Sequence, residues 1–250
     1  MICIVLAAGY ATRMYPLTEN FPKPLLEVQE KPILNWLLED IDQIAEIERI
    51  VVVSNHKFIG HFEEWQKRQH FVKPLTVLDD GSTGNEKRVG AVKDIQVALE
   101  AIDGCPDALV IAGDNVLEFS FGGFVTYYQS IGHSCIMCYR EPDLAKQRKT
   151  GIITIDVSGK VTSFAEKPVA PLSDLAVPPF YCYTANDLSR IDEAVAEGCS
   201  TDAPGSFAAW LSRHSEVYAW LMPGKRYDIG SLDGYRLVQE AFRSQRTQAE

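Results

Sequence analysis

The order of short apolar runs and longer amphipathic stretches is the strongest constraint on how this chain folds. Runs rich in valine and isoleucine occupy 2–8, 49–55, 75–80 and 108–114. Between two of them, a predicted helix begins at Pro32, a favourable first-turn residue. One face of this helix carries Leu34, Leu37, Leu38, Ile41 and Ile44. Alternating strands and helices predict an α/β fold, a doubly wound and mainly parallel sheet with helices on both faces.

The second half of the chain is richer in strands. We expect strands at 134–140, 151–157, 160–166, 180–185 and 216–222, and further helices near 56–69, 89–102, 187–197, 204–213 and 231–243. The strands crowd together from 134 to 184 around one long loop at 168–179. This predicts a small antiparallel region laid over the ends of the main sheet as a second layer. We expect one domain over 1–243 and a tail at 244–250.

Composition and charge narrow the classes of partner. Of the 250 residues, 46% are hydrophobic and 23% are charged, as in a soluble globular protein. The formal net charge of -10 argues against nucleic acid and anionic membranes as partners. A protein this acidic that handles phosphates needs locally placed cations or a divalent metal to offset repulsion.

The cysteines indicate a reducing compartment. Six cysteines are scattered, several of them inside apolar runs, which is typical of free buried thiols. Cys135 and Cys138 form a C-x-x-C pair on a predicted strand, where this spacing sends the two thiols to opposite faces. We therefore favour two core cysteines over a metal or redox site. With no basic leader and no apolar run of membrane-spanning length, we expect a cytoplasmic protein.

The stretch "LAAGYATRMYPLT", from Leu6 to Thr18, follows the first predicted strand. Ala7, Ala8 and Gly9 remove side-chain bulk, so backbone N–H groups can approach an anion, and Arg13 adds a fork of donors. "PKPLL" then places Lys23 between two prolines. Singly, these features also fit a tight turn and a solvated lysine. The loop matches neither G-x-x-x-x-G-K-[ST] nor G-x-G-x-x-G.

Together, "LAAGYATRMYPLT" and "PKPLL" resemble the signature of the sugar-1-phosphate nucleotidyltransferases, LAxGxGTRxxPLT followed by PKPxL. Further matches follow in chain order: "VIAGDN" at 110–115, "GIITID" at 151–156, "FAEKP" at 164–168 and "RYDIGSLDGY" at 226–235. The resemblance covers nearly the whole chain. It implies a Rossmann-like fold with a nucleotide-binding part at about 1–133 and an acceptor-binding part at about 134–243. It also implies an enzyme that joins a nucleoside triphosphate to a sugar 1-phosphate and releases pyrophosphate.

The resemblance assigns the catalytic residues. Asp114 and Asp228 match the pair that holds Mg²⁺ in the family, and oxygen ligands that bridge to phosphates suit this ion. Either aspartate alone also fits a cap or turn former. Arg13 would hold the β- and γ-phosphates, and Lys23 would contact the α-phosphate. The acceptor phosphate is already a nucleophile, so alignment and charge neutralisation suffice for catalysis.

The acceptor and the base have their own matched positions. Lys167 would hold the sugar phosphate, Glu166 would accept hydrogen bonds from sugar hydroxyls, and Gly151 would admit the sugar ring. The alternative for Glu166 and Lys167 is an exposed charged pair before a proline turn. Tyr181 lines the acceptor pocket or fills the core.

The base would lie over Leu6 to Gly9. It would be read near Asn85, with Gly90 opening a helix. The alternative for the segment "DDGSTGNEKRVGAVKD" at 79–94 is a flexible polar loop.

Two departures from the family pattern concern Ala11 and the "AVPPFYCY" segment. Ala11 replaces the second loop glycine, which costs about 1 kcal/mol if that position needs a positive φ. Pro178 and Pro179 alter the usual acceptor motif. We expect dTTP or UTP as donor, with a CTP-dependent enzyme for a small phosphorylated alcohol, such as phosphocholine, as the close alternative. A non-catalytic nucleotide-sugar sensor is the alternative outside enzymes. Family members are often oligomers, so a homo-oligomer is possible.

Overall fold

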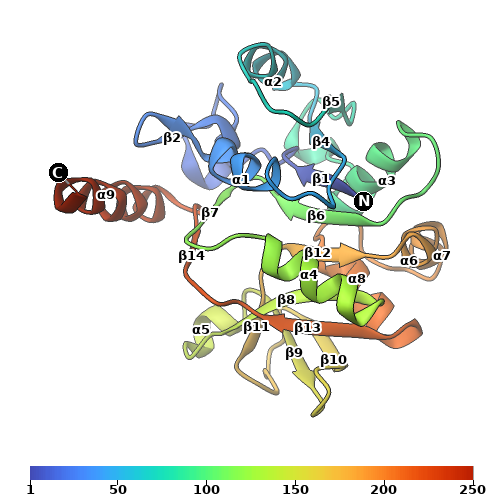
Figure 1. Ribbon diagram of the computed structural model, residues 1–250. Coiled ribbons are helices and arrows are strands. Elements are labelled where there is room, and N and C mark those ends of the chain that lie inside the picture. Colours follow the sequence, from blue (N-terminus) through green and yellow to red (C-terminus); the bar gives the residue numbers. More distant parts are fainter. Residues whose placement is uncertain (250) are drawn as a thin grey trace.

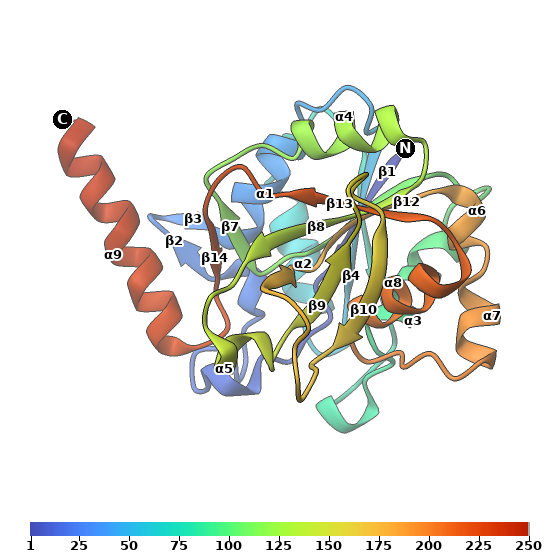
Figure 2. The ribbon, with the colours of Figure 1, turned by 90° about the horizontal axis from the view of Figure 1, so that it is seen from below.

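A ten-stranded sheet forms the centre of the molecule, and helices cover both of its faces (Figures 1 and 2). The computed structural model describes residues 1–249, with side chains described up to residue 243. The strands are β1 Ile2–Leu6, β2 Glu27–Val28, β3 Lys31–Pro32, β4 Arg49–Ser54, β5 Leu75–Asp79, β6 Ala108–Ala112, β7 Asn115–Leu117, β8 Ser134–Arg140, β9 Gly151–Ile155, β10 Val161–Glu166, β11 Leu175–Val177, β12 Phe180–Tyr183, β13 Val217–Leu221 and β14 Arg226–Asp228. The helices are α1 Ile33–Ile41, α2 Ile59–Gln66, α3 Ala91–Glu100, α4 Gly122–Ile131, α5 Leu144–Gln147, α6 Ala185–Leu188, α7 Ile191–Ala196, α8 Gly205–His214 and α9 Leu232–Ala249. No helix within residues 1–249 is both long and apolar enough to cross a lipid bilayer.

The first half of the chain forms the predicted parallel part of the sheet. β6, β1, β4 and β5 lie side by side and run in the same direction. Leu6 at the end of β1 pairs with Ala112 on one side and with Val53 on the other. The carboxyl ends of the four strands therefore meet at one edge, where the loops that follow them gather.

Both faces of the parallel strands are buried, which confirms the doubly wound arrangement. Ile2 and Ile4 of β1 belong to the core cluster that includes residues of α3, α7 and α8. Cys3 and Val5 belong to the opposite cluster, with residues of α1, α2 and α4. Successive side chains on a strand point to opposite faces, so near-continuous apolar runs suit a sheet covered on both sides.

The antiparallel region differs from our expectation of a second layer. β12 pairs antiparallel with β6 on one edge and with β8 on the other, so the later strands extend the same sheet. β11, inside the predicted loop at 168–179, joins β8 to β9 and extends the sheet further. We did not predict α4, whose sequence opens with two glycines and continues with aromatic and β-branched residues of low helix propensity.

α9 lies at the side of the molecule (Figure 1) and continues to Ala249, through most of the expected tail. Its Phe242 ring contacts Trp36 and Tyr227. Tyr235 donates from its hydroxyl to the carbonyl of Glu27. These contacts attach α9 to the region around β2 and β14. The division into two parts stays a prediction.

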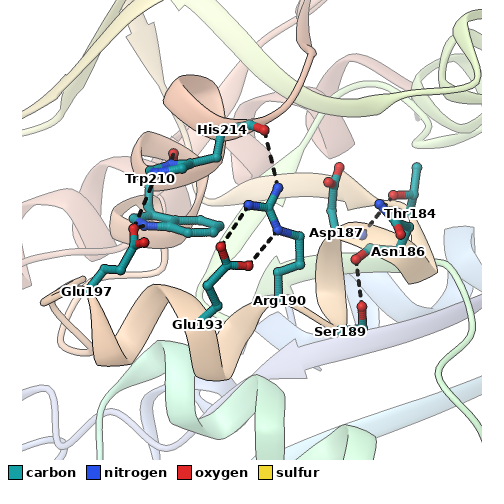
Figure 3. A network of polar contacts seen from close by, with 9 residues as sticks. All are labelled: Thr184, Asn186, Asp187, Ser189, Arg190, Glu193, Glu197, Trp210 and His214. Atoms are coloured by element: carbon teal, nitrogen blue, oxygen red, sulfur yellow. Dashed lines mark hydrogen bonds and ion pairs between the residues drawn. The ribbon is translucent and has the colours of Figure 1, made fainter.

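A polar network fixes α7 and α8 next to each other (Figure 3). Arg190 donates two hydrogen bonds to Glu193 and lies over the Trp210 ring, and the Trp210 indole N–H donates to Glu197 at 2.8 Å. The connecting segment at 199–204 runs back to the first turn of α3, where the carbonyl of Thr201 accepts from the N–H of Val92. This segment, between the two helices, thereby holds the N-terminal end of α3.

Candidate active site

The loop after β1 lines a cavity of about 490 Å³ at the carboxyl ends of the parallel strands. Asn55 donates from its amide to the carbonyl of Ala8 at 2.9 Å, which fixes the start of the loop to β4. A Cβ built on Gly9 meets no atom within 4 Å, so this backbone faces open space. The lining residues are Leu6, Ala7, Gly9, Ala11, Thr12, Arg13, Met14, Lys23, Pro24, Asn85, Arg88, Ala112, Asp114, Asp228 and Gly230. The cavity thus gathers most of the predicted nucleotide-side residues.

Ala11, which stands where the family pattern has a glycine, adopts the left-handed conformation. Its φ is 47° and its ψ is 40°. The Ala11 carbonyl accepts from the buried Thr18 hydroxyl at 2.8 Å and from the N–H of Met14 at 2.9 Å. These two bonds offset the steric cost of a Cβ in this conformation, so the loop keeps its shape without the glycine.

The structure brings Asp114 and Asp228 together although 113 positions separate them in the sequence. Asp114 immediately precedes β7, and Asp228 ends β14, which pairs antiparallel with β7 and sets Asp228 opposite Asn115. The ammonium group of Lys23 contacts the Asp114 carboxylate, and the Asn115 amide donates to the same carboxylate at 2.8 Å. Two acidic side chains and one lysine therefore share one wall of the cavity.

This wall fits a magnesium ion that is completed by substrate. Mg²⁺ prefers oxygen ligands and is commonly held by one or two carboxylates together with substrate phosphates. Among residues 1–249 there is no cluster of three or more histidine, cysteine, aspartate or glutamate side chains that could hold a metal alone. The contact between Lys23 and Asp114 places one positive charge directly against this carboxylate.

A second, smaller cavity of about 190 Å³ adjoins the first and shares Leu6, Gly9, Arg88 and Ala112 with it. Its remaining lining residues are Ala8, Asp80, Gly90, Ala91, Asp94, Asp202 and Pro204. We call the first cavity the phosphate cavity and the second the base-side cavity.

Gly90 is part of the wall of the base-side cavity and immediately precedes α3. Its φ is 97°, and a Cβ there would lie 2.4 Å from the carbonyl oxygen of Thr201, so a side chain is excluded. Asn85 lines the phosphate cavity, and its side-chain carbonyl accepts from Arg88 at 3.2 Å. Gly90 thus opens α3 as predicted, and Asn85 lies at the cavity.

Asp94 also lines the base-side cavity and is only 5% exposed. Its Oδ1 has no hydrogen-bond partner among the described residues. Burial, together with the nearby Asp80 carboxylate, raises the pKa of Asp94 to about 8. A neutral carboxyl group at this place is a feature that our sequence reading missed.

A scan against protein-family models matches residues 2–245 to the family described as nucleotidyl transferase. The chain belongs to this family. The chain is 26% identical to the UTP-glucose-1-phosphate uridylyltransferase of Haloferax volcanii, over 95% of this chain and 90% of the relative. It is 26% identical to the glucose-1-phosphate adenylyltransferase of Fervidobacterium nodosum, over 94% of this chain and 59% of the relative.

The fold agrees with this membership. The solved structure of a UDP-glucose pyrophosphorylase complexed with UDP-glucose matches with a TM-score of 0.84 and 21% identity, covering 98% of this chain and all of the other. Family and fold class are therefore confirmed as predicted from the loop motifs. The chain is an enzyme of the nucleotidyltransferase class.

Glu166, Gly151 and Tyr181, the residues predicted to bind the acceptor, lie close together. A Cβ built on Gly205 would lie 2.8 Å from the Glu166 carboxylate and 3.4 Å from the Tyr181 hydroxyl. Burial raises the pKa of Glu166, and Lys167 partly offsets this rise. A Cβ on Gly151 would lie 2.6 Å from the Phe164 ring, so packing alone already requires this glycine. Tyr181 is 2% exposed and stacks on Tyr183, which makes its ring part of the core.

Lys167 and Arg226 bring positive charge close to residues already described, Lys167 to Asp202 and Arg226 to Asn115. Lys167 has a φ of 48°. Asp202 lines the base-side cavity, and its pKa is lowered mainly by the hydrogen bond from Arg88 and to a smaller extent by the charge of Lys167. Arg226 donates to Asn115 at 2.7 Å and lies over the Tyr139 ring at 5.3 Å.

Sequence reasoning named neither Arg226 nor Arg88. The signal for Arg226 was its place two residues before Asp228, since residues two apart on a strand share a face.

The C-x-x-C pair is structural. Cys135 and Cys138 lie on opposite faces of β8, in different core clusters. Burial raises the pKa of Cys135 to about 12 and that of Cys138 to about 11, so both thiols stay protonated at neutral pH. All six cysteines are free, as expected.

Proposed function

We propose that this enzyme transfers a nucleoside monophosphate from a nucleoside triphosphate to a sugar 1-phosphate and releases pyrophosphate. The observation that carries the proposal is the wall formed by Asp114, Asp228 and Lys23 beside the small-residue loop, at one cavity. Backbone donors, a lysine and paired carboxylates suit a polyphosphate and a divalent cation.

Arg13 and Lys23 would act on the triphosphate. Arg13 lines the phosphate cavity and would bind the β- and γ-phosphates, which leave as pyrophosphate. Lys23, whose side chain is 11% exposed, would donate to the α-phosphate as charge develops there. Asp114 and Asp228 would hold Mg²⁺, which neutralises phosphate charge when bound. No general base is needed, because the acceptor phosphate oxygen is already ionised.

Lys167, Glu166 and Arg226 would bind the acceptor. Lys167 would donate to the acceptor phosphate, and Glu166 would accept from sugar hydroxyls. Arg226 reaches Asn115, the neighbour of Asp114, and so links the acceptor side to the metal-binding wall. The names of the two relatives, a uridylyltransferase and an adenylyltransferase, support glucose 1-phosphate as the first acceptor to test. dTTP and UTP remain the donors that we expect.

The test is pyrophosphate release with Mg²⁺ across five nucleoside triphosphates and a panel of sugar 1-phosphates that also contains phosphocholine. We expect turnover with at least one sugar 1-phosphate and none without the metal. Turnover with phosphocholine and CTP alone would replace the acceptor class. Nucleotide binding without pyrophosphate release from any pair would favour the sensor.

Lys167→Ala tests the acceptor assignment. The KM for the sugar 1-phosphate should rise about tenfold or more, while the KM for the triphosphate changes little, because one charged hydrogen bond is lost on the acceptor side only. Lys146→Ala, at an exposed position in α5, is the matched control. Equal losses for both substrates would show that Lys167 does not hold the acceptor.

A further inference from the structure

A chain of hydrogen bonds leads from Arg226 to Asp114, one of the two proposed metal ligands. The Arg226 guanidinium donates to the side-chain carbonyl of Asn115 at 2.7 Å, and the Asn115 NH₂ group donates to the Asp114 carboxylate at 2.8 Å. Asn115 is 0% exposed, so both ends of its amide depend on partners inside the protein. The proposed function uses Asp114 and Arg226 and gives Asn115 no role.

The pairing of β7 with β14 brings these side chains together. Asp228 pairs directly with Asn115, and Arg226 pairs with Leu117. Directly opposed residues of an antiparallel pair lie on the same face, and a long side chain also reaches the diagonal neighbour. Arg226 reaches Asn115 in this diagonal way. Asn115 is therefore linked to Asp228 through strand pairing and to Asp114 through its side chain.

Arg226 determines which end of the Asn115 amide faces Asp114. A guanidinium group has only donors, so the end of the amide next to Arg226 is the carbonyl oxygen. The NH₂ end then faces the Asp114 carboxylate, which is an acceptor. Without Arg226, the buried carbonyl loses its partner, and the amide is no longer held in this orientation.

The Asp114 carboxylate has two donors of different kinds. Lys23 contacts its Oδ2, and Asn115 donates to its Oδ1. Since the proposed function assigns Lys23 to the α-phosphate, Asn115 is the donor that stays with Asp114 when the triphosphate binds. Asn115 is neutral, so it orients the carboxylate without cancelling the charge that attracts a cation.

We infer that Asn115 is a positioning residue for the transfer, which orients the Asp114 carboxylate for Mg²⁺, and that Arg226 holds the Asn115 amide in the required orientation. This inference rests on the proposed function. A purely structural role, in which the amide only fastens β7 to β14, would lower stability without affecting metal-dependent binding more than metal-independent binding.

The test measures the affinity for UTP and for dTTP by calorimetry without acceptor, once with Mg²⁺ and once with EDTA. Mg²⁺ binds the free nucleotide equally in every sample, so a difference between variants in the ratio of the two affinities reports on the protein. Asn115→Leu keeps the approximate size of the side chain and removes the donor. We expect the ratio to fall about tenfold, because loss of a hydrogen bond to a metal ligand typically costs about 10–100-fold in metal affinity. The affinity in EDTA should change little.

Arg226→Met separates positioning from simple electrostatics. Loss of a nearby positive charge by itself favours a bound cation, so a purely electrostatic role of Arg226 would raise the ratio. The positioning role lowers it, because the Asn115 amide is no longer held. In the double variant with Asn115→Leu, Arg226→Met should cause no further fall, because both changes act on one chain of hydrogen bonds.

Asn35→Leu is the matched control. Asn35, in α1, also bridges two side chains, since it accepts from Trp65 at 2.8 Å and donates to Gln69 at 2.8 Å. Its substitution should lower the melting temperature and leave the affinity ratio as in the wild type. Thermal melts show whether each variant is folded. If Asn115→Leu does not fold, the sign of the change in Arg226→Met decides alone.

Failure of the inference differs from failure of the proposed function. If Mg²⁺ strengthens triphosphate binding in the wild type and the ratio is unchanged in Asn115→Leu, or rises in Arg226→Met, the inference is wrong and the proposed transfer stands. Equal losses with Mg²⁺ and with EDTA would also overturn the inference, because the role is then structural. If neither triphosphate binds the wild-type protein, the proposed function and the inference both fail.

Discussion

Two aspartates line the phosphate cavity and three line the base-side cavity, and the surroundings of Asp114 and Asp228 differ from those of Asp94 and Asp80. Asp114 and Asp228 share the phosphate cavity with Lys23, whose ammonium group contacts Asp114. Asp94 and Asp80 share the base-side cavity with no cation of their own. The same residue type therefore lies beside a cation in one place and beside a second carboxyl group in the other, where burial and Asp80 raise the pKa of Asp94.

This difference matters for a chain with a formal net charge of -10. Such a chain binds a polyphosphate only if its cations are concentrated where the phosphates lie. Arg13 and Lys23 line the phosphate cavity. In the base-side cavity, protonation of Asp94 removes one negative charge and supplies a donor. Substitutions in the two pairs should therefore have different consequences.

The largest expected effect is on turnover, in Asp114→Asn or Asp228→Asn. Each replaces a carboxylate that we propose as a Mg²⁺ ligand, and we expect pyrophosphate release to fall by at least about a hundredfold. Far-UV circular dichroism should stay as in the wild type, since neither residue belongs to the buried core. Asp233→Asn, at an exposed position in α9, is the control. Wild-type turnover in either variant with Mg²⁺ present would show that the replaced aspartate is not a required metal ligand.

Asp94→Asn should instead change how stability depends on pH. In the folded protein Asp94 is protonated up to about pH 8, whereas in the unfolded chain its carboxyl ionises near its ordinary value of 3.8. Between these values the unfolded state binds fewer protons, so this residue lowers the free energy of unfolding as the pH rises from about 4 to about 8. Asparagine does not ionise, so the Asp94→Asn variant lacks this loss of stability with rising pH.

Urea denaturation at several pH values checks this expectation. The stability of Asp94→Asn relative to the wild type should grow across that interval, by an amount on the order of a few kcal/mol, and then level off. Taking the difference between the two proteins cancels the other titrating groups. A constant difference from pH 5 to pH 9 would mean that the pKa of Asp94 is not raised in the folded protein.

The sequence predicts the phosphate cavity better than the base-side cavity, for a physical reason. Residues 6–14 and Lys23 are close in sequence, and their small and basic side chains already indicate an anion site. Asp94 reads as a polar position in an amphipathic helix, and it is buried only because the segments at 80–90 and 199–204 fold over α3. That burial is a tertiary effect without a local signal.

The same reason explains the errors in the fold. The parallel half follows from strands and helices that alternate locally. Whether the later strands form a second layer or extend the first sheet depends on which edge β12 pairs with, and β12 pairs on both edges. β11 has only three residues in a segment rich in proline, so its pairing partners, not its own sequence, make it a strand.

The smallest expected effect is on the free energy of unfolding, in a substitution at Ala11 in the loop of the phosphate cavity. Ala11 has a φ of 47°, where a Cβ costs about 1 kcal/mol. Ala11→Gly should therefore raise the free energy of unfolding by about 0.5–1 kcal/mol, whereas Ala101→Gly, at a φ of -82°, should lower it. If the bonds from Thr18 and Met14 alone hold the loop, triphosphate affinity stays unchanged in Ala11→Gly. If affinity falls, the alanine itself restricts the loop to its binding conformation, and the departure from the family glycine contributes to preorganisation of the phosphate cavity.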